Sequence, residues 1–176
     1  MIRHVTRRQG VIRIWRDTSG SALLEGAIVT PFLAILVFGV LEFSRYFYQQ
    51  HLVSTGVRDA ARYLARTSDP TAGGAQTTAQ NLAATGSPSG GMARRTVGFD
   101  PADVSISFSL VDNSIDGATG LRPYRQMTSE CGGPDQVRLI SVTGSFTFAP
   151  LGFWGFFGFS APAISVTHTE RCIGPG

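Results

Sequence analysis

The chain offers few residues that could carry out chemistry. Its 15 basic residues are all arginines, so it supplies neither a Schiff-base lysine nor the lysine of a phosphate-binding loop. Its histidines, His4, His51 and His168, show no metal-ligand spacing. No G-x-S-x-G motif, H-E-x-x-H motif or pair of catalytic acids stands out. We therefore predict a protein that is not an enzyme, with no cofactor and no metal site.

The positive charge is concentrated at the N-terminus. Residues 1–20 hold five arginines and one aspartate, a net charge of +4. Residues 21–176 hold ten arginines and eleven acids, a net charge of −1, and the two sum to the +3 of the chain. A nucleic-acid-binding protein carries its basic patch on the folded domain. We therefore expect no nucleic-acid partner and interpret residues 1–20 as a basic leader peptide.

A hydrophobic segment, Ala22–Leu41, follows the leader, and Glu25 is its only charged residue. As a helix it would span about 30 Å, the thickness of the hydrocarbon core of a bilayer. It is too long for a cleaved secretory signal, and no A-x-A site follows it. A buried helix of a soluble protein is the other alternative. We predict a transmembrane helix over residues 21–43, with the N-terminus in the cytoplasm because the arginines precede it.

The helical pattern continues outside the membrane over residues 44–66. One apolar face recurs at helical spacing and consists of Val53, Val57, Ala60, Ala61 and Leu64. Aromatic residues at positions 43 and 46–48 stand where the helix would leave the bilayer, as in an interfacial aromatic belt. We expect the helix to end near Arg66, because Ser, Pro and Gly residues follow it.

Beyond the helix the composition changes first, and further along the chain the apolar residues change from helical spacing to alternation. Residues 67–100 are rich in Gly, Ser, Thr and Ala, which is typical of a linker, with room for a short helix over 76–84. Apolar residues then alternate with Ser and Thr near 104–110, 137–148 and 164–167, which predicts three strands. We therefore predict an α+β fold, in which the long N-terminal helix packs on a small antiparallel β domain over residues 101–176.

Two features of the β domain stand apart. Cys131 and Cys172 are the only cysteines, and an even count outside the cytoplasm favours a disulfide, with two free thiols as the alternative. Leu151–Ala161 (LGFWGFFGFSA) is rich in aromatic residues, and its glycines are not a dinucleotide fingerprint, because no strand–turn–helix pattern surrounds them. It either folds its aromatics onto the sheet, the reading we favour, or exposes an apolar patch to a partner subunit or the membrane.

The junction between leader and apolar helix resembles a type IV pilin precursor. Such precursors have a basic leader that ends in Gly, a processing site directly after it, and Glu as the fifth residue of the mature chain. Here Gly20 precedes Ser21, and Glu25 is the fifth residue counted from Ser21.

Residues 20–66 more closely resemble the TadE-like family, the pseudopilins of the tight-adherence (Tad, Flp) pilus system. The shared features are Glu25, Pro31 within the hydrophobic run, the GVLEFSR exit at residues 39–45 and the Ala-Ala-Arg ending at residues 60–62. Gly26 replaces the aromatic residue that major Flp pilins carry after the Glu, and the chain is far longer than those pilins. Both departures favour a minor pseudopilin.

The resemblance implies a pilin-like fold and a structural role in pilus biogenesis, surface adhesion and biofilm formation. The chain would insert in the inner membrane, with its C-terminal domain in the periplasm, and a prepilin peptidase would cut it after Gly20. Its partners would be other pilins or pseudopilins, inner-membrane pilus assembly proteins and the lipid bilayer. Glu25 would pair with the new N-terminus of a neighbouring subunit.

Helix packing would use Gly26, Pro31 and Gly39, although ordinary membrane-helix composition explains these residues equally well. The alternative function is an unprocessed, single-span, membrane-anchored periplasmic scaffold or sensor domain of a secretion or assembly complex.

Overall fold

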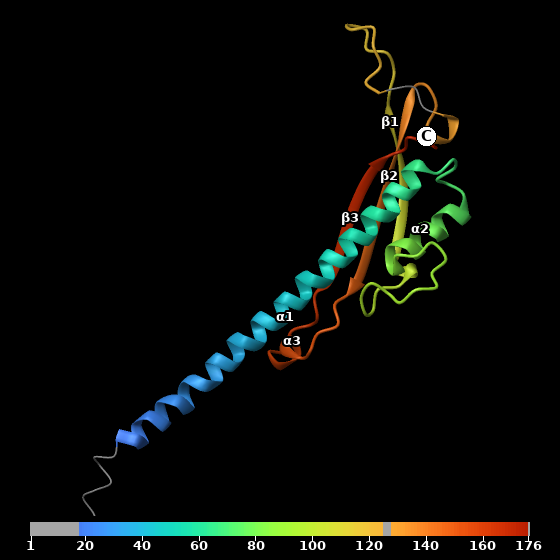
Figure 1. The fold of residues 1–176 in the computed structure, drawn as a ribbon. Helices are drawn as coiled ribbons and strands as arrows, with labels where there is room; N and C mark the ends of the chain where they lie inside the picture. Colours follow the sequence, from blue (N-terminus) through green and yellow to red (C-terminus); the bar gives the residue numbers. More distant parts are fainter. Residues whose placement is uncertain (1–17, 125–127, 176) are drawn as a thin grey trace, which may run out of the picture. The chain divides into compact units, whose positions relative to one another are not determined.

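The computed structural model describes residues 18–124 and 128–175, with side chains from Gly20 onward. The leader arginines and His4 therefore lie outside the described residues. The helices are α1 (Thr18–Arg66), α2 (Gly73–Thr85) and α3 (Phe153–Phe156). The strands are β1 (Val104–Asp112), β2 (Gln136–Thr147) and β3 (Ala163–Arg171) (Figure 1). Two compact units meet in sequence between Leu41 and Glu42.

The first unit contains the apolar half of α1. Its large side chains are mostly exposed on every side of the helix, as Leu24 (65%), Phe32 (70%) and Phe38 (63%) illustrate. In the described part of the chain, α1 is the one helix long and apolar enough to cross a membrane. A helix that is hydrophobic all round must be covered by protein or by lipid, so this half of α1 is a single-pass membrane anchor.

The second unit contains a three-stranded antiparallel sheet in the order β1-β2-β3, which confirms the predicted strands (Figure 1). Phe108 pairs with Ile140, and Thr143 pairs with Thr167. Because neighbouring side chains in a strand point to opposite faces, the alternation in sequence separates an apolar face from a face of Ser and Thr. On the hydroxyl face, Thr143 Oγ1 lies 2.8 Å from Thr167 Oγ1.

The outer half of α1 packs against this sheet, as the sequence predicts. The five residues of the predicted apolar face are all 0% exposed: Val53, Val57, Ala60, Ala61 and Leu64. They share one core with Ile140, Val142 and Ile164 of the sheet. Gly144 allows the close approach, because a Cβ at this position would lie 3.0 Å from Val57 and 2.9 Å from the Phe99 ring. The α+β architecture is therefore confirmed.

The Gly/Ser/Thr/Ala-rich segment 67–100, expected to be a linker, contributes to the core. It forms α2, which buries Ala79, Ala83 and Ala84, and it places Phe99 at 0% exposure. The small side chains that give the segment a linker-like composition are the ones that let α2 approach α1 closely. At Gly56 of α1, a Cβ atom would overlap the backbone carbonyl of Ala83.

A disulfide joins Cys131 to Cys172, and both residues are 0% exposed. The prediction of a bridge is therefore confirmed. The chain that follows β3 also bonds to the end of α1, because the backbone N–H groups of Ile173 and Gly174 donate to the Ala65 carbonyl at 2.8 and 3.1 Å. The C-terminal segment thus satisfies a carbonyl that the helix end would otherwise leave unpaired.

The contact between α1 and α2 leads to a prediction for Gly56→Ala. The added methyl group has no space against Ala83, so we expect the free energy of unfolding to fall by about 1–3 kcal/mol. Gly74→Ala in α2 is the matched control, since nothing lies within 4 Å of its Cβ position, and it should be neutral or stabilising by up to about 1 kcal/mol. Chemical denaturation of the detergent-solubilised chain measures both, and equal effects would contradict the packing.

Candidate functional site

The residues of the predicted processing and assembly site all lie on α1. Gly20, Ser21 and Glu25 are exposed and belong to one continuous helix. A Cβ at Gly20 or Gly26 would meet no atom within 4 Å, so the helix surface is open at these positions. Pro31 lies within the same helix, and so does Gly39. Residues 20–31 of this site therefore lie on an exposed, apolar helix surface, whereas Gly39 is buried.

Glu42 forms a second notable feature, one that the sequence analysis missed. It is the first residue after the apolar run and is only 1% exposed. Its carboxylate accepts the backbone N–H of Leu151, with Oε1 at 2.9 Å and Oε2 at 3.2 Å. Within the described residues no ion pair neutralises it. A hydrogen bond to a charged acceptor is stronger than a neutral one, so this contact fixes the start of the segment that connects β2 to β3.

Aromatic contacts hold the same segment against α1. Trp154 of α3 packs edge-on against Phe43, with ring centroids 5.4 Å apart. Phe148, directly after β2, packs in the same way against Tyr46, with ring centroids 5.5 Å apart. Gly152 allows the chain to turn into α3, because its φ of 121° is a conformation that other residues rarely adopt. The segment is therefore built onto residues 42–46 of α1.

These contacts correct two expectations about the aromatic residues. The Leu151–Ala161 segment does not fold its aromatics onto the sheet: Trp154 packs against the core, but Phe156 (76%) and Phe159 (65%) are exposed. In turn, Phe43 and Tyr46, expected in an aromatic belt, pack partly against protein. The sequence pattern could not distinguish these roles, because they depend on which side of α1 receives the segment.

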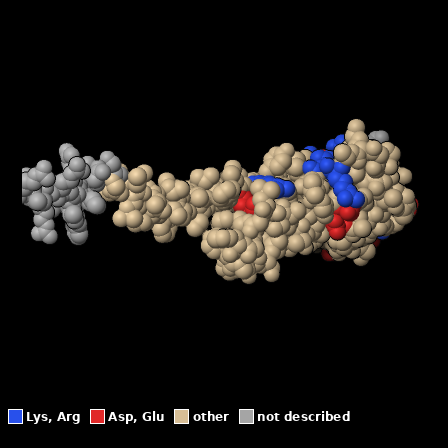
Figure 2. All heavy atoms as spheres, turned by 90° about the horizontal axis from the view of Figure 1, so that it is seen from below, with Lys and Arg blue, Asp and Glu red and all other residues tan. Residues whose placement is uncertain are grey.

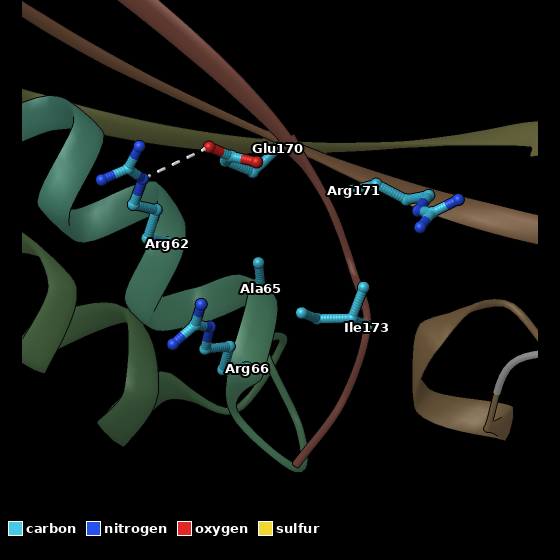
Figure 3. A pocket seen from close by; sticks show the side chains of 6 residues that line it. All are labelled: Arg62, Ala65, Arg66, Glu170, Arg171 and Ile173. Carbon is cyan, nitrogen blue, oxygen red and sulfur yellow. Dashed lines mark ion pairs between the residues drawn. The ribbon is translucent and has the colours of Figure 1, made fainter. Parts of the chain in front are cut away.

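Charged residues line a cavity of about 520 Å³ between α1 and the end of β3. Figure 3 shows the side chains that line it: Arg62, Ala65, Arg66, Glu170, Arg171 and Ile173. Arg62 Nε lies 3.7 Å from Glu170 Oε1, and His168 Nε2 lies 2.9 Å from the same oxygen. Among the lining residues, Arg62 and Glu170 are the one described ion pair, and none of the lining residues is a nucleophile.

On the face drawn in Figure 2, arginines and carboxylates likewise lie next to one another. In Figure 2, blue arginine side chains meet red carboxylates in two places, a small one near the middle and a larger stripe, and most of the remaining described surface in this view is uncharged. Among the described contacts, Arg95 also bonds Asp59 at 2.8 Å, and Arg122 bonds Asp135 at 2.6 Å. These two arginines thus join separate segments of the second unit.

Four exposed carboxylates have lowered pKa values, and each has a local cause. The hydroxyl and backbone N–H of Thr71 bond Asp69 and lower its pKa. Ser114 lowers the pKa of Asp112 through the same pair of groups. Hydrogen bonds from Ala118 and Thr119 lower the pKa of Asp116, and a hydrogen bond from the Ser129 hydroxyl lowers the pKa of Glu130. These groups stabilise turns, because each carboxylate is held in its ionised form.

The described residues give no metal site, since nowhere among them do three His, Cys, Asp or Glu side chains gather to hold an ion. What the arrangement can do is mechanical and interfacial. The first unit presents an apolar helix with one exposed carboxylate, Glu25. The second unit carries an aromatic segment that is held by the carboxylate of Glu42.

The comparison with protein families concerns the apolar helix of the first unit and the residues that follow it in α1. The family model described as TadE-like protein matches residues 20–62. Residues 20–62 are therefore similar to the TadE-like family. The match begins at Gly20 and ends within α1, so it covers the membrane anchor and part of the packed helix, and none of the sheet. Searches of curated proteins and of solved structures found no match.

The match confirms the resemblance predicted for the N-terminal helix. A TadE-like segment indicates involvement in a Tad pilus system, in association with other pilus components. The TadE-like family is one of structural pilus components.

The Glu42–Leu151 contact leads to a prediction for amide hydrogen exchange. In Glu42→Ala the Leu151 N–H loses its charged acceptor, a loss of about 1.5–3 kcal/mol, so its exchange should accelerate on the order of 10- to 100-fold. Glu42→Gln keeps an oxygen acceptor and should show a smaller change. The Phe148 amide, which donates to the Pro162 carbonyl at 3.0 Å, is the internal control. An unchanged rate at Leu151 in Glu42→Ala would contradict the contact.

Proposed function

We propose that the chain is a minor pseudopilin of a tight-adherence (Flp) pilus system, and that it acts in pilus biogenesis and surface adhesion. The observation that carries this proposal is the TadE-like match, which starts at the Gly of the predicted processing site. The apolar half of α1 then stores the subunit in the inner membrane, with the globular unit in the periplasm. No step of this function requires catalysis by the chain itself.

Processing changes the electrostatics of the N-terminus. Cleavage after Gly20 by a prepilin peptidase removes a segment of net charge +4 and leaves a new α-ammonium group on Ser21. The chain then begins directly at its apolar helix, so it can leave the bilayer for a bundle of helices in which lipid contacts are exchanged for helix contacts. The open surface at Gly26 supports close helix approach.

Glu25 supplies the carboxylate for assembly. A carboxylate in hydrocarbon is costly, on the order of 2.5–3.5 kcal/mol for an acid at the centre of a helix, and such residues are usually functional. In an assembled bundle the Ser21 ammonium of one subunit would pair with Glu25 of its neighbour, where the low dielectric strengthens the attraction. The pair would fix the axial stagger between subunits.

Processing is tested by the mass and N-terminal sequence of the chain purified from cells that contain the pilus system. We expect the mature chain to begin at Ser21. A Gly20→Leu variant, whose longer side chain blocks the peptidase site, should keep the leader. If the wild-type chain keeps its N-terminus intact, the unprocessed periplasmic scaffold or sensor becomes the better description.

The role of Glu25 is tested by Glu25→Ala. Membrane insertion should persist because the helix becomes more apolar, but piliation scored by electron microscopy should be lost. Thr30→Ala is the matched control: it removes a polar group from the same helix, one that bonds only the Gly26 carbonyl at 2.6 Å. Normal piliation in Glu25→Ala, at wild-type protein levels in the membrane, would refute the assembly role.

A further inference from the structure

The segment that joins β2 to β3 has an unusual composition for a water-exposed loop. Residues 148–163 contain no charged residue, and Ser160 is their only polar side chain apart from the indole of Trp154. Leu151, Phe156 and Phe159 are 70%, 76% and 65% exposed. The loop thus presents a continuous apolar surface, which in soluble proteins marks an interaction site.

The attachment of this segment sets its depth relative to a bilayer. It is fixed to Glu42 by the hydrogen bond at Leu151 and to Phe43 by Trp154. These two residues directly follow the apolar run in sequence. With residues 22–41 filling the hydrocarbon core, Glu42 and Phe43 lie at the level of the lipid headgroups. The segment attached to them lies at the same level.

The residue types suit this level. Aromatic side chains concentrate at membrane–water interfaces, and the exposed part of the segment consists mainly of phenylalanine. On α1 itself, Phe47 and Tyr48 add further exposed aromatic surface, at 62% and 63%. A soluble partner is the competing occupant. Continuity with the membrane anchor favours lipid instead, because the patch begins where the anchor ends.

We propose that the segment Leu151–Phe159 is a second membrane contact, an interfacial anchor that inserts its phenylalanines among the lipid headgroups beside the point where α1 leaves the bilayer. This inference rests on the membrane-anchor part of the proposed function and is independent of pilus assembly. Interfacial anchors set the tilt and rotation of a spanning helix. The Glu42–Leu151 contact therefore transmits the orientation of the bilayer to the globular unit.

The test uses the full-length chain in phosphatidylcholine vesicles, at a lipid excess that keeps protein copies apart. Single-cysteine variants Phe156→Cys and Phe159→Cys carry an environment-sensitive fluorophore. Labelling is specific because the two native cysteines form the disulfide. Leu121→Cys is the matched control, since Leu121 is 70% exposed and lies between β1 and β2, at the opposite end of the sheet. Phe32→Cys reports insertion of the anchor.

Lipids brominated high on the acyl chain quench fluorophores near the headgroups, and lipids brominated near the chain end quench fluorophores at the bilayer centre, such as one at position 32. We expect blue-shifted emission and loss of fluorescence at positions 32, 156 and 159, and neither at position 121. Quenching at 32 alone would overturn the interfacial anchor and leave the membrane anchor standing. A blue shift at 156 without lipid quenching would also overturn it, in favour of contact with a second protein copy. Absence of quenching at every position would refute both anchors.

Discussion

One helix has to satisfy two different surroundings, and this constraint shapes the whole molecule. The first half of α1 is apolar on all sides, whereas the second half, beyond the exposed aromatic residues near its start, is apolar on one buried stripe only. Lipid can cover the first, but only protein can cover the second while leaving charged residues in water. The three-stranded sheet supplies that cover with Ile140, Val142 and Ile164, and its other face carries hydroxyl groups. The sheet and α2 thus supply the protein surface that buries the apolar stripe of α1.

The change between the two surroundings takes place at Glu42. A carboxylate at this position ends the apolar run, and burial would be unfavourable without a donor. The donor is a backbone N–H from a segment that lies 109 residues further along the chain. The same bond that stabilises the carboxylate brings an uncharged aromatic segment to the boundary. The residue that closes the apolar run of α1 therefore also positions an exposed apolar surface of the globular unit.

Local periodicity explains why most of the fold could be predicted from the sequence. Spacing of three and four residues places Val53, Val57 and Leu64 on one face, and spacing of two separates Ile106 and Phe108 from the intervening serines. The disulfide could be predicted because the chain has only two cysteines. The processing site stays a prediction, and it rests on neighbouring residues alone, namely a Gly, the residue after it and a Glu at fixed spacing.

Interactions between distant segments could not be predicted in this way. No local rule pairs Glu42 with Leu151 or Asp59 with Arg95, and alanines in the Gly-rich segment give no indication of which backbone they will approach. The aromatic segment illustrates the same limit. Its composition shows that it must avoid water, but whether sheet, lipid or partner covers it depends on its attachment to α1.

Under the proposed pilus function, the two proposed membrane contacts together bear on how the subunit would be extracted from the bilayer. If the spanning helix were the only contact, extraction would exchange lipid contacts for helix contacts, and the globular unit could rotate freely about the helix. With the aromatic segment also in the interface, extraction must move both surfaces, and it exposes phenylalanines that only another apolar surface can cover. A neighbouring subunit in an assembly would then gain a hydrophobic contact that the membrane-bound subunit does not offer. Burial in the bilayer would thereby keep stored subunits from using this contact before assembly begins.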